Sequence, residues 1–166
     1  MKTIKLLLLL FFAVFGTISN AQEFKQAAGI RLGLSPGFEY RIFADAENSY
    51  KFLLSTRDRG MQFHVLKEFH NYDLFDFTDQ LVFFYGAGLH AGYERWDVKY
   101  YHYYSEVYST HTAFVAGLDG LAGLEYVFNE VPISLGVEVK PYFEFFGKET
   151  FDLQLFDFAF TAKYLF

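Results

Sequence analysis

The chain has 166 residues and a formal net charge of −6, with 20 acidic residues against 14 lysines and arginines. This acidic balance, which shows no basic patch, argues against nucleic acid as a partner. The absence of cysteine excludes a disulfide framework and a lipid-anchored N-terminal cysteine. Aromatic residues make up 22% of the chain, far more than a soluble protein usually carries. The length predicts one domain.

The first 21 residues have the pattern of a secretory signal peptide, with two lysines, an apolar run from Leu6 to Phe15 and small residues before Gln22. Cleavage after Ala21 would leave residues 22–166 as the mature domain. It would also move the net charge from −6 to −8, because the leader holds two lysines and no acid. The apolar run is too short for a membrane-spanning helix, and no longer one follows it. Many aromatic residues without such helices favour a β-barrel.

The first half of the mature chain alternates apolar and polar residues with a period of two, which is typical of β-strands. The alternation predicts strands over residues 24–34, 38–42, 50–56 and 61–69, with polar turns between them. The apolar phase changes from even to odd positions across Arg57–Gly60. These four residues are therefore predicted to form a tight turn.

Longer alternating segments predict strands over residues 81–96, 114–128 and 133–145, and a closing strand that begins after Thr150 and ends at Phe166. The longest connection runs from Asp97 to His111 and is rich in tyrosine. Pro141 has no N–H to donate, so we expect it near a strand end or a bulge. A slip of phase at Leu155–Phe156 predicts a bulge in the closing strand.

The last eleven residues, Phe156–Phe166, form a strand pattern with one strongly aromatic face and an aromatic C-terminal residue. This strand resembles the closing strand of bacterial outer-membrane β-barrels. The resemblance implies that it pairs with the first strand and that its terminal aromatic residue is part of a signal for the outer-membrane assembly machinery. The segments Gly117–Tyr126 and Glu138–Pro141 also resemble a group of small outer-membrane barrel proteins of unassigned function. That likeness implies a fold and a location, and no activity.

Together these patterns predict an all-β fold, an eight-stranded antiparallel transmembrane β-barrel with up-and-down topology. An even number of strands puts both termini on the periplasmic side of the outer membrane and the long connection outside the cell. A soluble, lipocalin-like barrel is the alternative. However, the large apolar faces of eight strands would overfill an interior of this size. We therefore expect these faces to contact the lipid and lipopolysaccharide of the outer membrane.

The opposite faces of the strands carry single charges and repeated glycines, and are predicted to line the lumen. The charged set holds six basic and seven acidic residues, namely Arg31, Glu39, Arg41, Lys51, Arg57, Glu68, Glu94, Asp119, Glu125, Glu138, Lys140, Asp157 and Lys163. Such charges are expected to neutralise one another in a structural salt-bridge network that also includes His64 and His90, rather than to form an ion path. Arg and Lys side chains are expected to occupy the space beside the inward glycines.

No motif for a metal, a nucleotide or another cofactor is present. Two enzyme types occur in barrels of this size, lipid A deacylase and lipid A palmitoyltransferase. The deacylase arrangement needs a histidine on the outer wall, whereas His64 and His90 are predicted to point inward. The polar residues of the long connection show no fixed triad geometry. The expected role is a non-enzymatic surface or envelope-stabilising one, with lipid A modification or a narrow channel as alternatives.

Tyrosine combines a large contact area with few rotatable bonds, which suits recognition surfaces. The long connection is therefore predicted to bind an unknown extracellular partner through Tyr100, Tyr101, Tyr103, Tyr104 and Tyr108. Alternatively, these residues extend the preceding strand as a protruding hairpin. The two interpretations are compatible.

Overall fold

The structure is a computed structural model that describes residues 24–102, 105–148 and 150–166, and it describes the side chains of these residues except 100–102 and 105–107. The predicted signal peptide and its cleavage site lie outside the described residues. In the part of the chain that is described, no helix has the length and apolar character needed to cross a membrane.

All regular structure in the described residues is β-strand, in the order β1 (Gln26–Gly33), β2 (Gly37–Phe43), β3 (Asn48–Arg57), β4 (Gly60–Asn71), β5 (Leu81–His102), β6 (Ser105–Val127), β7 (Ile133–Val139), β8 (Tyr142–Phe146), β9 (Phe151–Gln154) and β10 (Phe158–Leu165). Each pairing between neighbours is antiparallel.

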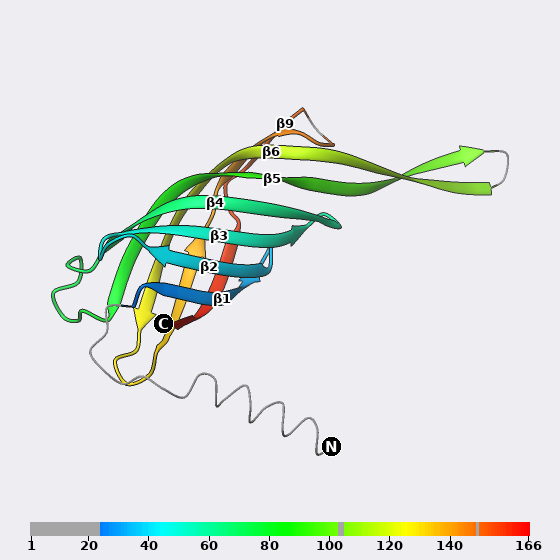
Figure 1. The fold of residues 1–166 in the computed structure, drawn as a ribbon. Helices are drawn as coiled ribbons and strands as arrows, with labels where there is room; N and C mark the ends of the chain where they lie inside the picture. The colour runs from blue at the N-terminus through cyan, green and yellow to red at the C-terminus, as the bar shows by residue number, and fades with distance from the viewer. Residues whose placement is uncertain (1–23, 103–104, 149) are drawn as a thin grey trace, which may run out of the picture.

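The sheet closes into a barrel because β10 pairs with β1, with Ala28 opposite Tyr164 and Ile30 opposite Ala162. The described segments make eight barrel strands. Strands β7 and β8 form one of them, because both pair with successive parts of β6. Strands β9 and β10 form another, because β9 pairs with β8 and β10 pairs with β7. The structure therefore confirms a closed, up-and-down barrel of eight antiparallel strands (Figure 1). Both described ends of the chain lie at one end of the barrel, which we call the terminal end.

Both interruptions of the long strands fall where the sequence pattern changes. Pro141 separates β7 from β8, and its carbonyl accepts a hydrogen bond from Gly120 N at 2.7 Å. Leu155 and Phe156 separate β9 from β10 and are both exposed, so the inward face passes from even to odd positions there. The tight turn at Arg57–Gly60 is also present. Asp58 and Arg59 have φ angles of 47° and 54°, the left-handed conformation of a two-residue hairpin turn.

The connection from Asp97 to His111 is largely β-strand, which agrees with the alternative of a protruding hairpin and not with an irregular loop. Strands β5 and β6 remain paired to His102 and Ser105, whereas the pairing of β4 with β5 ends at Tyr93 and that of β8 with β6 ends at Val115. The two strands therefore leave the barrel together as a long hairpin, which projects from the end opposite the termini, the hairpin end (Figure 1). Alternation between mixed polar and aromatic residues on both faces hid these strands from a search for one apolar face.

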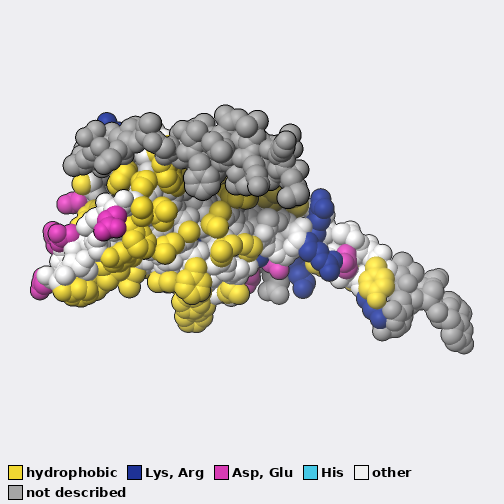
Figure 2. All heavy atoms as spheres, turned by 90° about the horizontal axis from the view of Figure 1, so that it is seen from below, with side chains coloured by type: hydrophobic (Ala, Val, Ile, Leu, Met, Phe, Trp, Pro, Cys, Tyr) yellow, Lys and Arg dark blue, Asp and Glu magenta, His cyan; other side chains and the backbone are white. Residues whose placement is uncertain are grey.

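Large apolar side chains lie on the outside of the barrel. Among them Phe38 is 71% exposed, Phe160 70% and Leu89 60%, values far above those of an apolar core. Figure 2 shows hydrophobic side chains gathered over the barrel wall and basic side chains near the base of the hairpin. The described residues contain only a small buried apolar cluster, Leu66, Phe84 and Leu121. This distribution excludes the soluble alternative, whose core would be apolar.

Candidate functional site in the barrel lumen

The charged residues predicted to face the lumen all point into it. Twelve of the thirteen are buried, and the side chain of Arg57 is 13% exposed at the hairpin end. Ionised groups in such a place need partners, because taking an unpaired charge out of water costs several kcal/mol. The lumen meets this need with ion pairs that link every strand of the barrel wall except the β9 segment.

The half of the network nearer the terminal end is built around three cations. Lys51 Nζ lies 2.6 Å from carboxylate oxygens of both Glu39 and Glu138. Arg41 contacts Glu68 at 2.6 Å and Glu125 at 2.7 Å. Lys163 bridges the two groups, because its Nζ lies 3.2 Å from both Glu39 and Glu125. The bridges cross the bore, so side chains of opposite strands meet.

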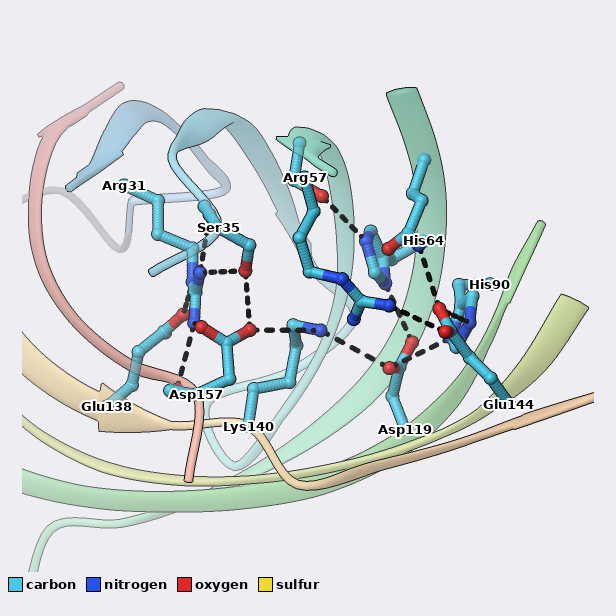
Figure 3. A network of polar contacts seen from close by, with 12 residues as sticks. Arg31, Ser35, Arg57, His64, His90, Asp119, Glu138, Lys140, Glu144 and Asp157 are labelled. Atoms are coloured by element: carbon cyan, nitrogen blue, oxygen red, sulfur yellow. Dashed lines mark hydrogen bonds and ion pairs between the residues drawn. The ribbon is translucent and has the colours of Figure 1, made fainter. Parts of the chain in front are cut away.

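Arg31 connects this half to the rest of the lumen. Its Nε donates to Glu138 at 2.7 Å, and one terminal nitrogen lies 3.2 Å from Asp157. The Ser35 hydroxyl accepts from Arg31 at 2.7 Å and donates to Asp157 at 2.5 Å. Lys140 then lies 3.4 Å from both Asp157 and Asp119. Figure 3 shows this continuous chain of contacts from Arg31 toward the hairpin end.

Two imidazoles meet one carboxylate at the far end of that chain. His64 Nδ1 lies 2.8 Å from one Asp119 oxygen, and His90 Nδ1 lies 3.0 Å from the other. The other ring nitrogen of His90 lies 3.1 Å from Glu144, which in turn accepts from Arg57 at 2.5 Å. Both ring nitrogens of His90 therefore lie beside carboxylates.

No family model matches the sequence, and no curated protein is found to be similar to it. Among solved structures, the chain is similar to the crystal structure of the N-terminal β-barrel domain of Pseudomonas aeruginosa OprF. The two share 13% sequence identity with a TM-score of 0.45, over 85% of this chain and 95% of that one.

The space beside the inward glycines of β5 and β6 is not occupied by Arg and Lys side chains as expected. A Cβ atom at Gly117 would lie 2.6 Å from the ring of His90, and one at Gly123 would lie 2.5 Å from the ring of Phe84. Leu66 similarly approaches Gly88. The cations instead extend toward carboxylates, whose opposite charge stabilises them in the lumen. The glycines thus make room for rings on a neighbouring strand.

Sequence reasoning missed several members of the network. Glu144 could have been included, because it follows the same alternation as Glu138 and Lys140. Ser35 had no such signal, since it was assigned to a turn, yet it is buried between Arg31 and Asp157. The other buried polar residues of the described lumen that were not singled out are Ser49, Ser55, Gln62, His70, Ser134 and Thr161.

Of the proposed binding residues, Tyr100, Tyr101 and Tyr108 lie on the paired strands of the hairpin. Tyr108 lies on β6 and is 63% exposed, with Lys99 Nζ 5.9 Å from its ring centroid. Tyr103 and Tyr104 lie outside the described residues, and the side chains of Tyr100 and Tyr101 are likewise not described. Of the five tyrosine side chains, the structure therefore describes that of Tyr108.

The base of the hairpin is fixed by polar contacts beyond the barrel rim. Asp97 accepts from Thr110 at 2.8 Å and pairs with Arg59 of the β3–β4 turn. The hydrogen bond from Thr110, together with the nearby Arg59 guanidinium, holds the pKa of Asp97 below its usual range. Trp96 stacks on His111 across the two strands. These contacts hold the hairpin at a defined position on the rim.

The terminal end of the bore opens into a cavity of about 440 Å³. Its lining includes Tyr72 and Val82 and reaches inward to Arg41 and Glu125. These last two residues form one of the short ion pairs of the network. The cavity therefore ends at paired charges that cross the bore.

Proposed function

We propose that this protein spans the bacterial outer membrane as a closed barrel with a sealed lumen. The observation that carries the proposal is the inverted distribution of side chains, with large hydrophobic groups outside and paired charges inside. Outer-membrane barrels show this arrangement, since their strands alternate between lipid and lumen. Both termini would then lie in the periplasm, surrounded at the barrel wall by lipid and lipopolysaccharide.

The role that fits this arrangement is a non-enzymatic one, to hold the β5–β6 hairpin at the cell surface. The hairpin strands extend beyond their neighbours for the residues past Tyr93 and before Val115, and they pair there with each other. Tyr108 offers an exposed aromatic side chain on this arm. An extracellular partner would bind along the hairpin, with the ion-pair network as its rigid base.

A direct test uses the absence of cysteine from the chain, which makes any introduced thiol unique. Tyr108→Cys on the hairpin and Asp76→Cys at the terminal end would be expressed separately and exposed to a membrane-impermeant maleimide on intact cells. We expect labelling of Tyr108→Cys on intact cells and of Asp76→Cys only after the outer membrane is permeabilised. The reverse pattern would place the hairpin in the periplasm and overturn the proposal.

The enzymatic alternative is tested separately by mass spectrometry of lipid A from cells with and without the protein. We expect identical acylation. We expect this because the described polar groups of the lumen form hydrogen bonds and ion pairs with one another. At the rim, Asp97 accepts a hydrogen bond from Thr110 and forms an ion pair with Arg59. A gained or lost acyl chain would show instead that rim residues act on lipid.

A further inference from the structure

Three potential metal ligands meet in the lumen because three adjacent strands bring them to one place. His64 of β4 lies directly opposite His90 of β5, and Asp119 of β6 lies opposite Gly88, two residues from His90. Ligand atoms of the three residues lie within 4.8 Å of one another, and all three side chains are fully buried. Figure 3 shows both rings directed at the Asp119 carboxylate.

The outer nitrogens of both rings are also held in place. His90 Nε2 lies 3.1 Å from Glu144, and His64 Nε2 lies 2.9 Å from the Ser55 hydroxyl. Metal-bound histidines almost always donate their second ring N–H to a carboxylate or another acceptor, which fixes the tautomer and the ring orientation. This outer layer is a second observation, independent of the three inner atoms, that points to a metal ion.

The charge of the lumen is also unbalanced. Among the described residues, the lumen holds eight buried carboxylates, including Glu144. Its cations are five buried side chains and Arg57, whose side chain is 13% exposed. Eight against six leaves an excess of two negative charges, which is costly to keep inside a narrow bore. One divalent cation with two neutral imidazoles would cancel that excess.

We propose that His64, His90 and Asp119 bind a divalent transition-metal ion of the Zn²⁺ class within the barrel. The ligands would be both Nδ1 atoms and a carboxylate oxygen. Two imidazoles with one carboxylate suit Zn²⁺, Ni²⁺ or Cu²⁺, whereas Ca²⁺ and Mg²⁺ prefer all-oxygen sites. This goes beyond the role of a surface anchor and does not depend on which partner the hairpin binds.

In the bound state each ring would coordinate the ion through Nδ1 and donate its Nε2 proton outward, His90 to Glu144 and His64 to Ser55. Lys140, now 3.4 Å from both Asp119 and Asp157, keeps Asp157 as its partner.

Binding requires the three side chains to rearrange around one ion. Metal–nitrogen bonds of about 2.0–2.1 Å in a tetrahedral site separate the ligand atoms by roughly 3.3 Å. At present the two rings contact different oxygens of Asp119, at 2.8 and 3.0 Å, and the ligand atoms lie within 4.8 Å of one another, so the rings must draw back from the carboxylate and converge on the ion. Because Gly117 has no side chain, the His90 ring lies against the backbone of β6, where a Cβ would contact it at 2.6 Å.

The test uses the tag-free chain from Gln22 to Phe166, which contains the whole barrel, refolded in detergent and freed of metal with EDTA. Zn²⁺ would be titrated against a chromophoric chelator, with Ca²⁺ as the comparison ion. We expect one Zn²⁺ per chain and no competition from Ca²⁺. His64→Gln and His90→Gln should lose the site.

Matched controls are the other two described imidazoles. His70→Gln, inside the lumen, and His111→Gln, on the hairpin, should each retain one Zn²⁺ per chain. Glu144→Gln, which alters only the outer layer, should weaken binding roughly 10- to 100-fold. Circular dichroism of every variant establishes that the barrel has formed.

Three results would overturn the proposal. The first is wild-type protein that binds no Zn²⁺. The second is binding that survives in both folded cluster variants or disappears equally in His70→Gln. If His64→Gln or His90→Gln does not fold, Asp119→Asn replaces it. His111→Gln separates the lumen site from adventitious binding on the hairpin, because loss of Zn²⁺ in that variant would place the bound ion outside the lumen and overturn the proposal.

Discussion

Glu138→Gln tests whether the buried ion pairs stabilise the barrel. Glu138 has a fully buried side chain and accepts from Arg31 at 2.7 Å and from Lys51 at 2.6 Å. Glutamine keeps the size of the side chain but removes its charge. Breaking a buried pair by removing one partner typically costs about 3–5 kcal/mol, because the remaining charge stays buried.

The contacts that Lys51 and Arg31 keep in Glu138→Gln determine where in this range the loss of unfolding free energy falls. Lys51 keeps Glu39 at 2.6 Å, and Arg31 keeps Asp157 at 3.2 Å together with Ser35. Neither cation is left alone, so we expect a loss near the lower end, about 3 kcal/mol of unfolding free energy. Adding Lys51→Met should recover part of this loss, because the double variant removes both charges of one pair while Glu39 keeps Lys163.

The assay is urea unfolding in lipid vesicles, followed by far-UV circular dichroism, for both single variants and the double variant. Glu130→Gln, in the exposed turn after β6, is the control and should change the unfolding free energy by no more than about 0.5 kcal/mol. Equal unfolding midpoints for Glu138→Gln and wild type would refute the reasoning. So would strictly additive effects in the double variant.

Three further predictions follow from the same architecture. Val137 lies on the outer face beside Phe160 and Leu124 and is 45% exposed. Val137→Arg should lower the unfolding free energy by roughly 2–4 kcal/mol in a lipid refolding titration, whereas Val137→Leu should be close to neutral. An unchanged unfolding free energy for Val137→Arg would show that this face does not contact lipid. Deletion of Phe166 should impair assembly in cells more than refolding in detergent, because the closing strand resembles an assembly signal, and equal assembly of both chains would remove that interpretation. Purified protein in planar bilayers should show no steady single-channel steps, since eight strands leave no aqueous channel and the bore is bridged by ion pairs; reproducible ion-selective steps altered by Glu138→Gln would instead make the network a conduction path.

The sequence alone determined the architecture, because alternation with a period of two assigns each side chain to one of two faces. Strand number, antiparallel order, the turn at Arg57–Gly60 and the irregularities at Pro141 and Leu155–Phe156 all follow from local pattern. The same alternation assigned the charged residues to the inward face, and it would have included Glu144 had it been applied throughout strand β8.

Only the tertiary structure decided which inward residues meet. Alternation gives the face of a residue but not its height in the bore, which depends on strand register and on the stagger of the closed barrel. Thus His64 and Asp119, which are 55 positions apart, are joined at 2.8 Å. Equally, Ser35, within its predicted turn between β1 and β2, contacts Asp157, 122 positions away. The tertiary structure also decided between a loop and a hairpin for the connection from Asp97 to His111. Strands outside the barrel have no buried face, so their sequence shows no apolar alternation.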